Sequence, residues 1–375
     1  MKQRGLSLNE DKSICIIIGT KKQKQDATKE IAEEPLKCGS FETKEKQEDK
    51  WLGQIISSKG LVDSVARTVE SREGKIKGAC LEISLIVNDW RARAVGGMET
   101  ALMLWQTCVI PSLLHGAGTW HQMSKQTEKQ LNSLQNWFLR LMLQVGPGAP
   151  LSSLLWETGL LDMGLLVWIE KIMLILHIRN LDQSAIARKV YEEQKRENWP
   201  GLAKETQEIC EELKIENVNI TSQNKKTYRK IVTEACHKLN EERLRNDAGN
   251  KEKCQRIMKE PYGRKKYIDG KIIHKVREQY RTRVGMQAFA GNYSHDKRFS
   301  KTQWKCRCDT SIENEAHLME GFCPVYGKVR EKYDDLDSDE NLIQMFNEIL
   351  TMRENLEEEE RREEEERRGK EKKRS

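Results

Sequence analysis

The feature that most constrains this chain is a change of hydrophobic period near Leu61. Before that residue, positions 14–18 and 51–58 form short runs rich in β-branched side chains, which predict two strands. From Leu61 onward, apolar residues recur about every 3.6 positions, the period of a helix that packs one face against a core. The sequence therefore predicts a mainly α fold, an α-rich α+β protein with a small N-terminal β-hairpin.

Several helices are predicted from their apolar residues. Positions 160–178 are apolar nearly all round, which is typical of a central core helix, whereas 202–213 and 228–244 are amphipathic. Residues 21–50 instead carry eight basic and eight acidic residues, so we expect a flexible loop or a hairpin tip there. The other apolar stripes are Met98, Ala101 or Leu102, Trp105 and Val109; Leu131, Leu134, Phe138 and Leu141, after Ser124 as an N-cap; and Tyr228, Ile231, Ala235 and Leu239.

Charge is distributed unevenly along the chain. Residues 331–375 hold 17 acidic and 10 basic residues, a local charge of −7, which leaves +13 for residues 1–330 of a chain whose formal net charge is +6. Residues 263–307 contain 13 Lys or Arg against three acidic residues, with Tyr267, Tyr280, Phe289, Tyr293 and Phe299 interleaved. This composition suits phosphates and stackable bases. It also fits a solvated basic face whose aromatic side chains lie in the core.

Composition and cysteine content indicate an intracellular chain. The longest uncharged run, 100–123, contains Gln106, Pro111 and two histidines, so no segment is predicted to span a bilayer. The apolar run at 14–18 is too short for a secretory signal. Ten cysteines without such a signal favour reduced thiols over a disulfide framework. We therefore expect a nuclear or cytoplasmic protein with no membrane partner.

The sharpest chemical signal is a cluster of three cysteines and one histidine. Cys306, Cys308, His317 and Cys323 fall within 18 residues, and three thiolates with one imidazole make a closed tetrahedral Zn²⁺ set. No ligand position would be left open, so the predicted zinc is structural. The alternative is a chance group of small core cysteines.

Other chemistry is not supported by the sequence. The glycine pairs lack the spacing of a dinucleotide or phosphate loop, and no nucleophile stands in a recognisable elbow. Tyr333, Asp334 and Asp335 have no apolar strand on either side, so we expect a helix start or a solvated turn rather than a Mg²⁺ site. The sequence therefore predicts no catalytic residue and no small-molecule substrate.

The order of several motifs resembles one known family. The string from Gly5 to Ser13, then an apolar strand, then Trp51-Leu52-Gly53, resembles the last palm segments of a non-LTR (LINE-like) retrotransposon reverse transcriptase, with Trp51 in place of Tyr. Pro150-Leu151 and Glu157-Thr158-Gly159 lie in a helical stretch similar to that family's thumb. The Cys/His cluster is similar to its C-terminal knuckle.

The resemblance implies a division of the chain into five parts. These are a palm remnant (1–60, with the charged insert 21–50), a helical thumb (61–185), a helical connector (186–262), a basic Cys/His knuckle region (263–330) and an acidic, charged helical tail that is partly disordered (331–375). The family's catalytic aspartates would precede Gly5. We therefore expect a C-terminal fragment of an RNA-directed DNA polymerase, itself not an enzyme and retaining no Mg²⁺ site.

The expected function is nucleic-acid binding, to RNA, DNA or both. The resemblance implies that Trp51-Leu52-Gly53 is a primer grip, and the basic run is expected to contact phosphates. If Ile273, Val276, Tyr280 and Val284 form a buried stripe, arginines of the same helix lie on its free flank. The alternative is a helical protein-interaction or scaffold protein with a charged tail. The predicted nucleic-acid contacts are Trp51, Leu52, Gly53, Arg264, Lys265, Lys266, Lys271, Arg277, Arg281 and Arg298.

Overall fold

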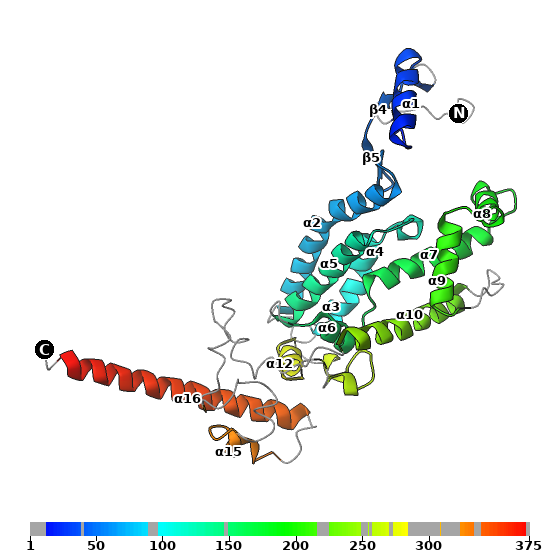
Figure 1. The fold of residues 1–375 in the computed structure, drawn as a ribbon. Helices are drawn as coiled ribbons and strands as arrows, with labels where there is room; N and C mark the ends of the chain where they lie inside the picture. The colour runs from blue at the N-terminus through cyan, green and yellow to red at the C-terminus, as the bar shows by residue number, and fades with distance from the viewer. Residues whose placement is uncertain are drawn as a thin grey trace. The chain divides into compact units, whose positions relative to one another are not determined.

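The structure is a computed structural model, and most of the part it describes is helical (Figure 1). It describes residues 13–38, 41–88, 97–145, 149–215, 225–248, 254, 257–269, 273–283, 308, 323–333 and 339–372. The mainly α prediction is thereby confirmed at this coarse level. None of the described helices combines the length and the apolar character that a bilayer crossing requires.

The described strands form three short pairs. They are β1 (Ile14–Cys15) with β4 (Lys44–Glu45), which are parallel, and two antiparallel pairs, β2 (Lys37–Cys38) with β3 (Phe41–Glu42) and β5 (Glu48–Trp51) with β6 (Gln54–Ser57). The prediction of one strand over 51–58 is therefore wrong. A turn interrupts it, because Leu52 and Gly53 have φ angles of 45° and 81°. Two left-handed residues in succession match the twist of a tight hairpin.

The charged segment 21–50, predicted as a loop or a hairpin tip, contains a helix as well as the β2–β3 pair. It begins with helix α1 (Lys21–Glu33), whose first turn is closed by a capping box. The Thr20 hydroxyl accepts a hydrogen bond from the Gln23 amide (3.4 Å), and the Gln23 side chain accepts one from the Thr20 amide (2.9 Å). Residues 21–33 contain no glycine or proline, so the cap and local propensity outweigh the lack of an apolar face.

Contacts between Cα atoms divide the chain into two compact units. Unit 1 comprises Met1–Ile83, Leu102–Phe138 and Leu161–Glu242, and unit 2 comprises Ser84–Ala101, Leu139–Leu160 and Arg243–Ser375. The five-part division expected from the resemblance remains a prediction. Further helices are α2 (Leu61–Asn88), α3 (Met98–Leu104), η4 (Trp105–Val109), α4 (Ile110–Leu113), η5 (Ala117–Thr119), α5 (Lys125–Leu143), α6 (Leu151–Thr158), α7 (Met163–Arg179), α8 (Ile186–Arg196), α9 (Leu202–Glu212), α10 (Lys225–Ala248), η7 (Ile257–Lys259), η8 (Lys266–Ile268), α12 (Ile273–Arg283), α15 (Gly327–Arg330) and α16 (Asp339–Lys372).

Helix α7 is the core helix of unit 1, as predicted for 160–178. It begins after Asp162, whose carboxylate accepts a hydrogen bond from the Gly164 amide at 2.7 Å. Its apolar residues share a buried cluster with α9 and α10, and α7 runs beside α9 (Figure 1). The stripe predicted over Met98 to Val109 is also buried. Trp105 stacks on Phe138 with a centroid separation of 4.4 Å.

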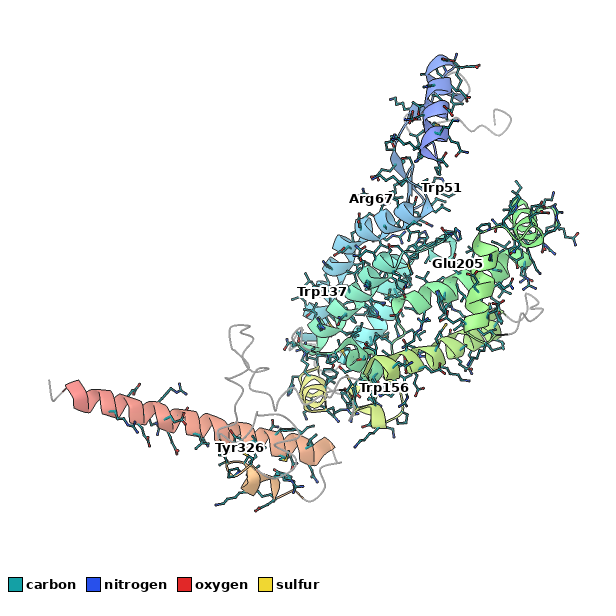
Figure 2. The ribbon with its side chains drawn as sticks, in the orientation of Figure 1. Trp51, Arg67, Trp137, Trp156, Glu205 and Tyr326 are labelled. Atoms are coloured by element: carbon teal, nitrogen blue, oxygen red, sulfur yellow. The ribbon has the colours of Figure 1, made fainter. Side chains whose placement is uncertain are left out.

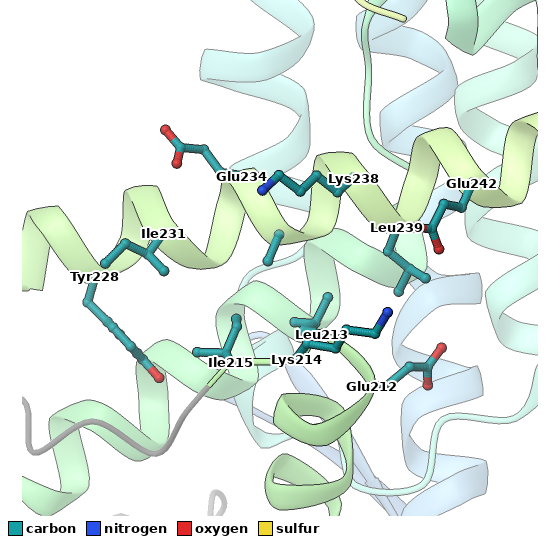
Figure 3. Close-up of a pocket in the computed structure, with 11 residues that line it drawn as sticks. Glu212, Leu213, Lys214, Ile215, Tyr228, Ile231, Glu234, Lys238, Leu239 and Glu242 are labelled. Atoms are coloured by element: carbon teal, nitrogen blue, oxygen red, sulfur yellow. The ribbon is translucent and has the colours of Figure 1, made fainter.

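The predicted face of α10 lies beside the buried one. Val232 and Cys236 are fully buried, whereas Ile231 is 47% exposed. The predicted residues Ile231, Ala235 and Leu239 instead line a groove of about 440 Å³ between α10 and the end of α9 (Figure 3). Tyr228 belongs to the core cluster and Ala235 and Leu239 pack against it, so the groove runs along the outer edge of that cluster. Charged side chains at its edge are Glu212, Lys214, Glu234, Lys238 and Glu242.

Unit 2 contains a second apolar cluster around α15 and α16. Tyr326, Leu342, Met345 and Phe346 are almost completely buried in it. Beyond the cluster, α16 continues as the predicted charged helix. Ion pairs join Glu358 to Arg362 (3.5 Å) and Glu363 to Arg367 (3.8 Å) at a spacing of four residues. These exposed pairs support the helix without packing.

Candidate nucleic-acid interface

The tip of the β5–β6 hairpin presents two large apolar side chains to solvent. Trp51 is 65% exposed and Leu52 is 70% exposed (Figure 2). Gly53 completes the turn, and a Cβ atom added there would lie 3.6 Å from the His115 ring. Exposed aromatic rings are the groups on which unpaired bases stack.

Arg72 of α2 fixes the backbone of this tip. Its Nη2 donates to the carbonyl oxygen of Gly53 (2.8 Å), while Nη1 donates to those of Leu113 (2.7 Å) and His115 (3.0 Å). The guanidinium also lies 5.9 Å from the ring centroid of Trp120. One cation therefore satisfies three carbonyl oxygens from two segments, and the hairpin tip is anchored to unit 1.

Arg264 and Lys266 are exposed cations at the start of the basic run, and only one of them is paired within the described residues. The Lys266 side chain makes no hydrogen bond or ion pair with any residue that the structure describes. Arg264, with a side chain 34% exposed, pairs with Asp269 and lies 3.5 Å from Glu99. Both cations are accessible to an anion, but only Lys266 would bind one without giving up an existing pair.

A shallow hollow of about 640 Å³ follows this run. Lys265 contributes to it from a half-buried position, where Nζ donates to the Pro261 carbonyl oxygen (2.6 Å) and pairs with Glu260 (3.2 Å). Four cationic side chains and one carboxylate line the hollow. Arg264, Lys265 and Arg283 are each paired with a carboxylate, so Lys266 is the one of the four whose charge has no counter-ion in the described residues and would favour an anion. The lining residues are Glu260, Pro261, Tyr262, Gly263, Arg264, Lys265, Lys266, Tyr267, Gln279 and Arg283.

A fully buried carboxylate holds the floor of the hollow. Glu157 of α6 accepts hydrogen bonds from Arg283 Nε (2.7 Å) and Nη2 (3.2 Å) and from the Tyr267 hydroxyl (2.8 Å). Arg283 Nη2 also donates to Glu260 (2.7 Å). Burial and the neighbouring Glu157 raise the pKa of Tyr267 well above its ordinary value. Burial raises the pKa of Glu260, but Arg283 and Lys265 outweigh it, so the net pKa is lowered.

The backbone of the basic run is tied to the same motif. The Lys265 amide donates to the Glu157 carbonyl oxygen at 3.1 Å. Gly159 adopts a φ of 66°, and a Cβ atom added there would come within 2.5 Å of the Arg264 nitrogen. Only glycine permits this approach. The string Glu157-Thr158-Gly159 therefore positions the residues from Arg264 to Lys266.

Arg277 is not on the free flank that its helix was expected to present. It is only 6% exposed, and it donates to the Met142 carbonyl oxygen (Nε, 2.6 Å) and to Asn88 Oδ1 (Nη1, 2.8 Å). The predicted stripe of Ile273, Val276 and Tyr280 is buried, but the helix packs over a wider arc than that stripe. A buried, hydrogen-bonded guanidinium supports the fold rather than a ligand.

The other predicted contacts cannot all be placed. Lys271 and Arg298 lie outside the described residues, as does Val284 of the predicted stripe. Arg281 is part of α12, but its side chain is outside the described part. Lys271, Arg281 and Arg298 therefore remain predicted nucleic-acid contacts.

Two of the four predicted zinc ligands belong to the described part. Cys323 is 2% exposed in the cluster around α15 and α16, and Cys308 packs against the same cluster. Cys306 and His317 lie outside the described residues. In the remainder of the described chain, no group of three or more His, Cys, Asp or Glu side chains could hold a metal ion. The zinc site therefore stays a prediction.

One buried polar cluster in unit 1 was missed by sequence reasoning. Lys171 interrupts the apolar helix α7 and is 2% exposed at its side chain. It pairs with Glu205 of α9 (Figure 2), which also accepts from His121 Nδ1 at 2.9 Å. Burial raises the pKa of Glu205, but the bonds from Lys171 and His121 lower it further, so the net pKa is lowered.

Comparison of the chain with models of protein families, with curated proteins and with solved structures finds no match. The likeness to a reverse transcriptase therefore rests on the sequence motifs alone.

Proposed function

We propose that the chain binds nucleic acid as the C-terminal, non-catalytic part of a non-LTR reverse transcriptase. The observation that carries this proposal is the cationic hollow of unit 2, with Lys266 exposed and without a partner in the described residues. Its walls are held in place by Glu157, so a phosphate would meet preorganised cations. At the hairpin tip of unit 1, the exposed Trp51 offers a stacking surface.

The salt dependence of RNA binding tests the proposal. Each phosphate contact to a single strand contributes roughly 0.7 to the slope of log affinity against log salt concentration. The variant Arg264→Ala/Lys266→Ala should therefore lower that slope by roughly 1.4. A matched control, Lys189→Ala/Lys230→Ala, removes two exposed cations from unit 1. If both variants change the slope equally, the hollow is not the binding face.

We also propose that Cys306, Cys308, His317 and Cys323 hold a structural Zn²⁺. In the sequence, these residues follow the ones that line the hollow. The support is that Cys308 and Cys323, 15 positions apart in sequence, pack on one apolar cluster. A zinc ion would hold together a segment with few apolar residues of its own.

A second candidate function, protein interaction, is favoured by the exposed face of α2. Gly74, Gly78, Leu81 and Leu85 recur at spacings of four, three and four residues, which is a coiled-coil seam. Leu81 is 50% exposed, Leu85 is 73% exposed, and space is open above both glycines. The buried residues of α2, such as Ile76, lie on the opposite face.

This seam is complementary to a second, antiparallel copy of itself. Pairing Gly74 with Leu85 of the other copy also pairs Gly78 with Leu81, so each leucine meets a glycine. The same alignment brings Lys75 near Glu82 of the other copy. Neither charged side chain has a partner among the described residues.

Light scattering of purified protein tests this self-association. Leu81→Glu should give a monomer, because two carboxylates would be buried at the seam. Lys75→Glu should weaken the dimer, and Lys75→Glu/Glu82→Lys should restore it. A wild-type monomer at all accessible concentrations, or a double variant that is no better than Lys75→Glu, would refute the pairing.

A further inference from the structure

A small polar pocket in unit 1 lies between the end of α7, the end of α8 and the beginning of α9. Its volume is about 200 Å³. Three cationic side chains line it: Arg179 in the last turn of α7, Lys195 in the last turn of α8 and Lys204 in the first turn of α9. No carboxylate is among the lining residues. Three helices therefore bring positively charged side chains to one pocket.

These cationic side chains have no direct partner within the described chain. The side chains of Arg179, Lys195 and Lys204 make no hydrogen bond or ion pair with any residue that the structure describes, although Glu192 acts on Tyr191 and Glu211 on Cys210 at the edge of the pocket. Arg179 is half-buried, and its charge opposes the rise that burial causes in the pKa of Tyr191, which also lines the pocket. Like charges brought together without a counter-ion repel one another. The arrangement is stabilised when an anion enters.

A buried hydroxyl in the same pocket also lacks a partner. Thr206 of α9 is 5% exposed, and its Oγ1 makes no hydrogen bond within the described residues. A buried hydroxyl without a partner costs free energy that a ligand oxygen would recover. In addition, Gly201 caps α9 without any side-chain hydrogen bond. The N-terminal end of a helix carries partial positive charge, which favours an anion there and disfavours Lys204 without one.

We infer that this pocket binds a phosphate group in its dianionic form. Three cations and a hydroxyl donor match the charge and the oxygen atoms of a phosphate monoester. A volume of about 200 Å³ accommodates a phosphate with an attached sugar but is too small for a continuous strand. The phosphate belongs either to the 5′ end of a nucleic acid or to the free inorganic ion, and this inference does not depend on the cationic hollow of unit 2.

Binding of two RNA oligonucleotides, identical except for a 5′-phosphate or a 5′-hydroxyl, tests the inference on the full chain. We expect about a tenfold preference for the phosphorylated RNA, which corresponds to about 1.4 kcal/mol. Lys195→Ala/Lys204→Ala should abolish the preference, and the control Lys189→Ala/Lys230→Ala should keep it. The preference should also shrink below about pH 6, where the phosphate dianion is protonated.

Two further measurements separate the sources and guard against misfolding. If both RNAs bind equally but calorimetry detects inorganic phosphate, lost in Lys195→Ala/Lys204→Ala, the free ion is the ligand. Thr206→Val should weaken phosphate binding without lowering the unfolding temperature, because the hydroxyl it removes has no partner. The inference is overturned if calorimetry detects no binding of inorganic phosphate and the 5′-phosphorylated RNA binds no better than the 5′-hydroxyl RNA. A preference that survives in Lys195→Ala/Lys204→Ala would do the same.

Discussion

Replacing Glu205 by glutamine should destabilise unit 1 far more than its partial exposure suggests. The Glu205 side chain is 21% exposed, but its partner Lys171 is 2% exposed. Glu205→Gln would remove the charge that compensates a buried ammonium group in the middle of α7. Breaking a buried pair by removing one partner typically costs about 3–5 kcal/mol. Because Glu205 retains some solvent contact, we expect a loss in the free energy of unfolding near the lower limit, about 3 kcal/mol.

The adjacent residue supplies a matched control. Glu170 precedes Lys171 in sequence and forms an ion pair with Arg229 at 2.5 Å, but the two side chains are 38% and 51% exposed. Pairs of this kind contribute roughly 0–1 kcal/mol. Glu170→Gln should therefore change the unfolding free energy little. Both variants lose one carboxylate charge, so a difference between them reports burial rather than net charge.

Urea unfolding gives the midpoint of each variant, and hydrogen exchange of peptides from α7 and α9 shows whether the loss of stability lies in this part of unit 1. With an m-value of about 2 kcal/mol per molar urea, the expected loss lowers the midpoint by roughly 1.5 M. The second substitution Lys171→Met should recover much of the loss, because it removes the uncompensated ammonium group. If Glu205→Gln and Glu170→Gln have the same midpoint, then Lys171 is solvated in another way and the argument from burial is wrong.

The same pair predicts a dependence on pH. The pKa of Glu205 is lowered in the folded protein. A lowered carboxyl pKa contributes stability that is complete above the unfolded-state value of about 4.3 and is lost as the pH falls through the folded-state value. The stability difference between wild type and Glu205→Gln should therefore be constant from pH 8 to about 5 and should shrink in more acidic solution.

Three other substitutions test separate parts of unit 2. Purified protein should contain about one zinc per chain by elemental analysis, lost in Cys308→Ser and kept in Cys108→Ser; zinc retained by Cys308→Ser would disprove the ligand set. Arg277→Met should lower the unfolding free energy by roughly 2 kcal/mol. It should leave the salt slope of RNA binding unchanged, because Arg277 is buried; a changed slope would show that Arg277 contacts a phosphate. Gly159→Ala should lower the melting temperature more than Gly53→Ala. Both glycines have positive φ, but a Cβ atom at Gly53 would make only an ordinary contact of 3.6 Å with the His115 ring; equal shifts would show that the clash at Gly159 is relieved.

Periodicity predicted the helices well where one face is buried and the rest is polar. Helix α9 was expected over 202–213 and is observed at Leu202–Glu212, and the described residues of the stripe predicted for α12, Ile273, Val276 and Tyr280, are buried. The same reasoning misplaced the inner face of α10 by one position. Adjacent apolar residues such as Ile231 and Val232 both fit a helical stripe, and only the packing of α7 and α9 decides which one is buried.

Charged residues were harder to predict, because their environment depends on distant segments. Lys171 was given no role, and Arg277 was expected to contact nucleic acid. Each is buried against partners far away in sequence, Glu205 for one and the Met142 carbonyl oxygen for the other. The cations of the phosphate pocket likewise come from three helices. No local pattern contains that information, because a cation exposed in one helix looks the same in sequence as one that is buried.

The structural role of Glu157 bears on how the resemblance is to be interpreted. Glu157-Thr158-Gly159 is one of the strings that resemble a reverse-transcriptase thumb, and in this structure each end of it has a packing role. Glu157 neutralises the buried Arg283, and Gly159 leaves room for the Arg264 backbone. A bulkier residue in place of Gly159 or an uncharged one in place of Glu157 would disturb the walls of the cationic hollow, so both ends of the string help to hold those walls. Under the function proposed above, the string would serve to present cations to nucleic acid.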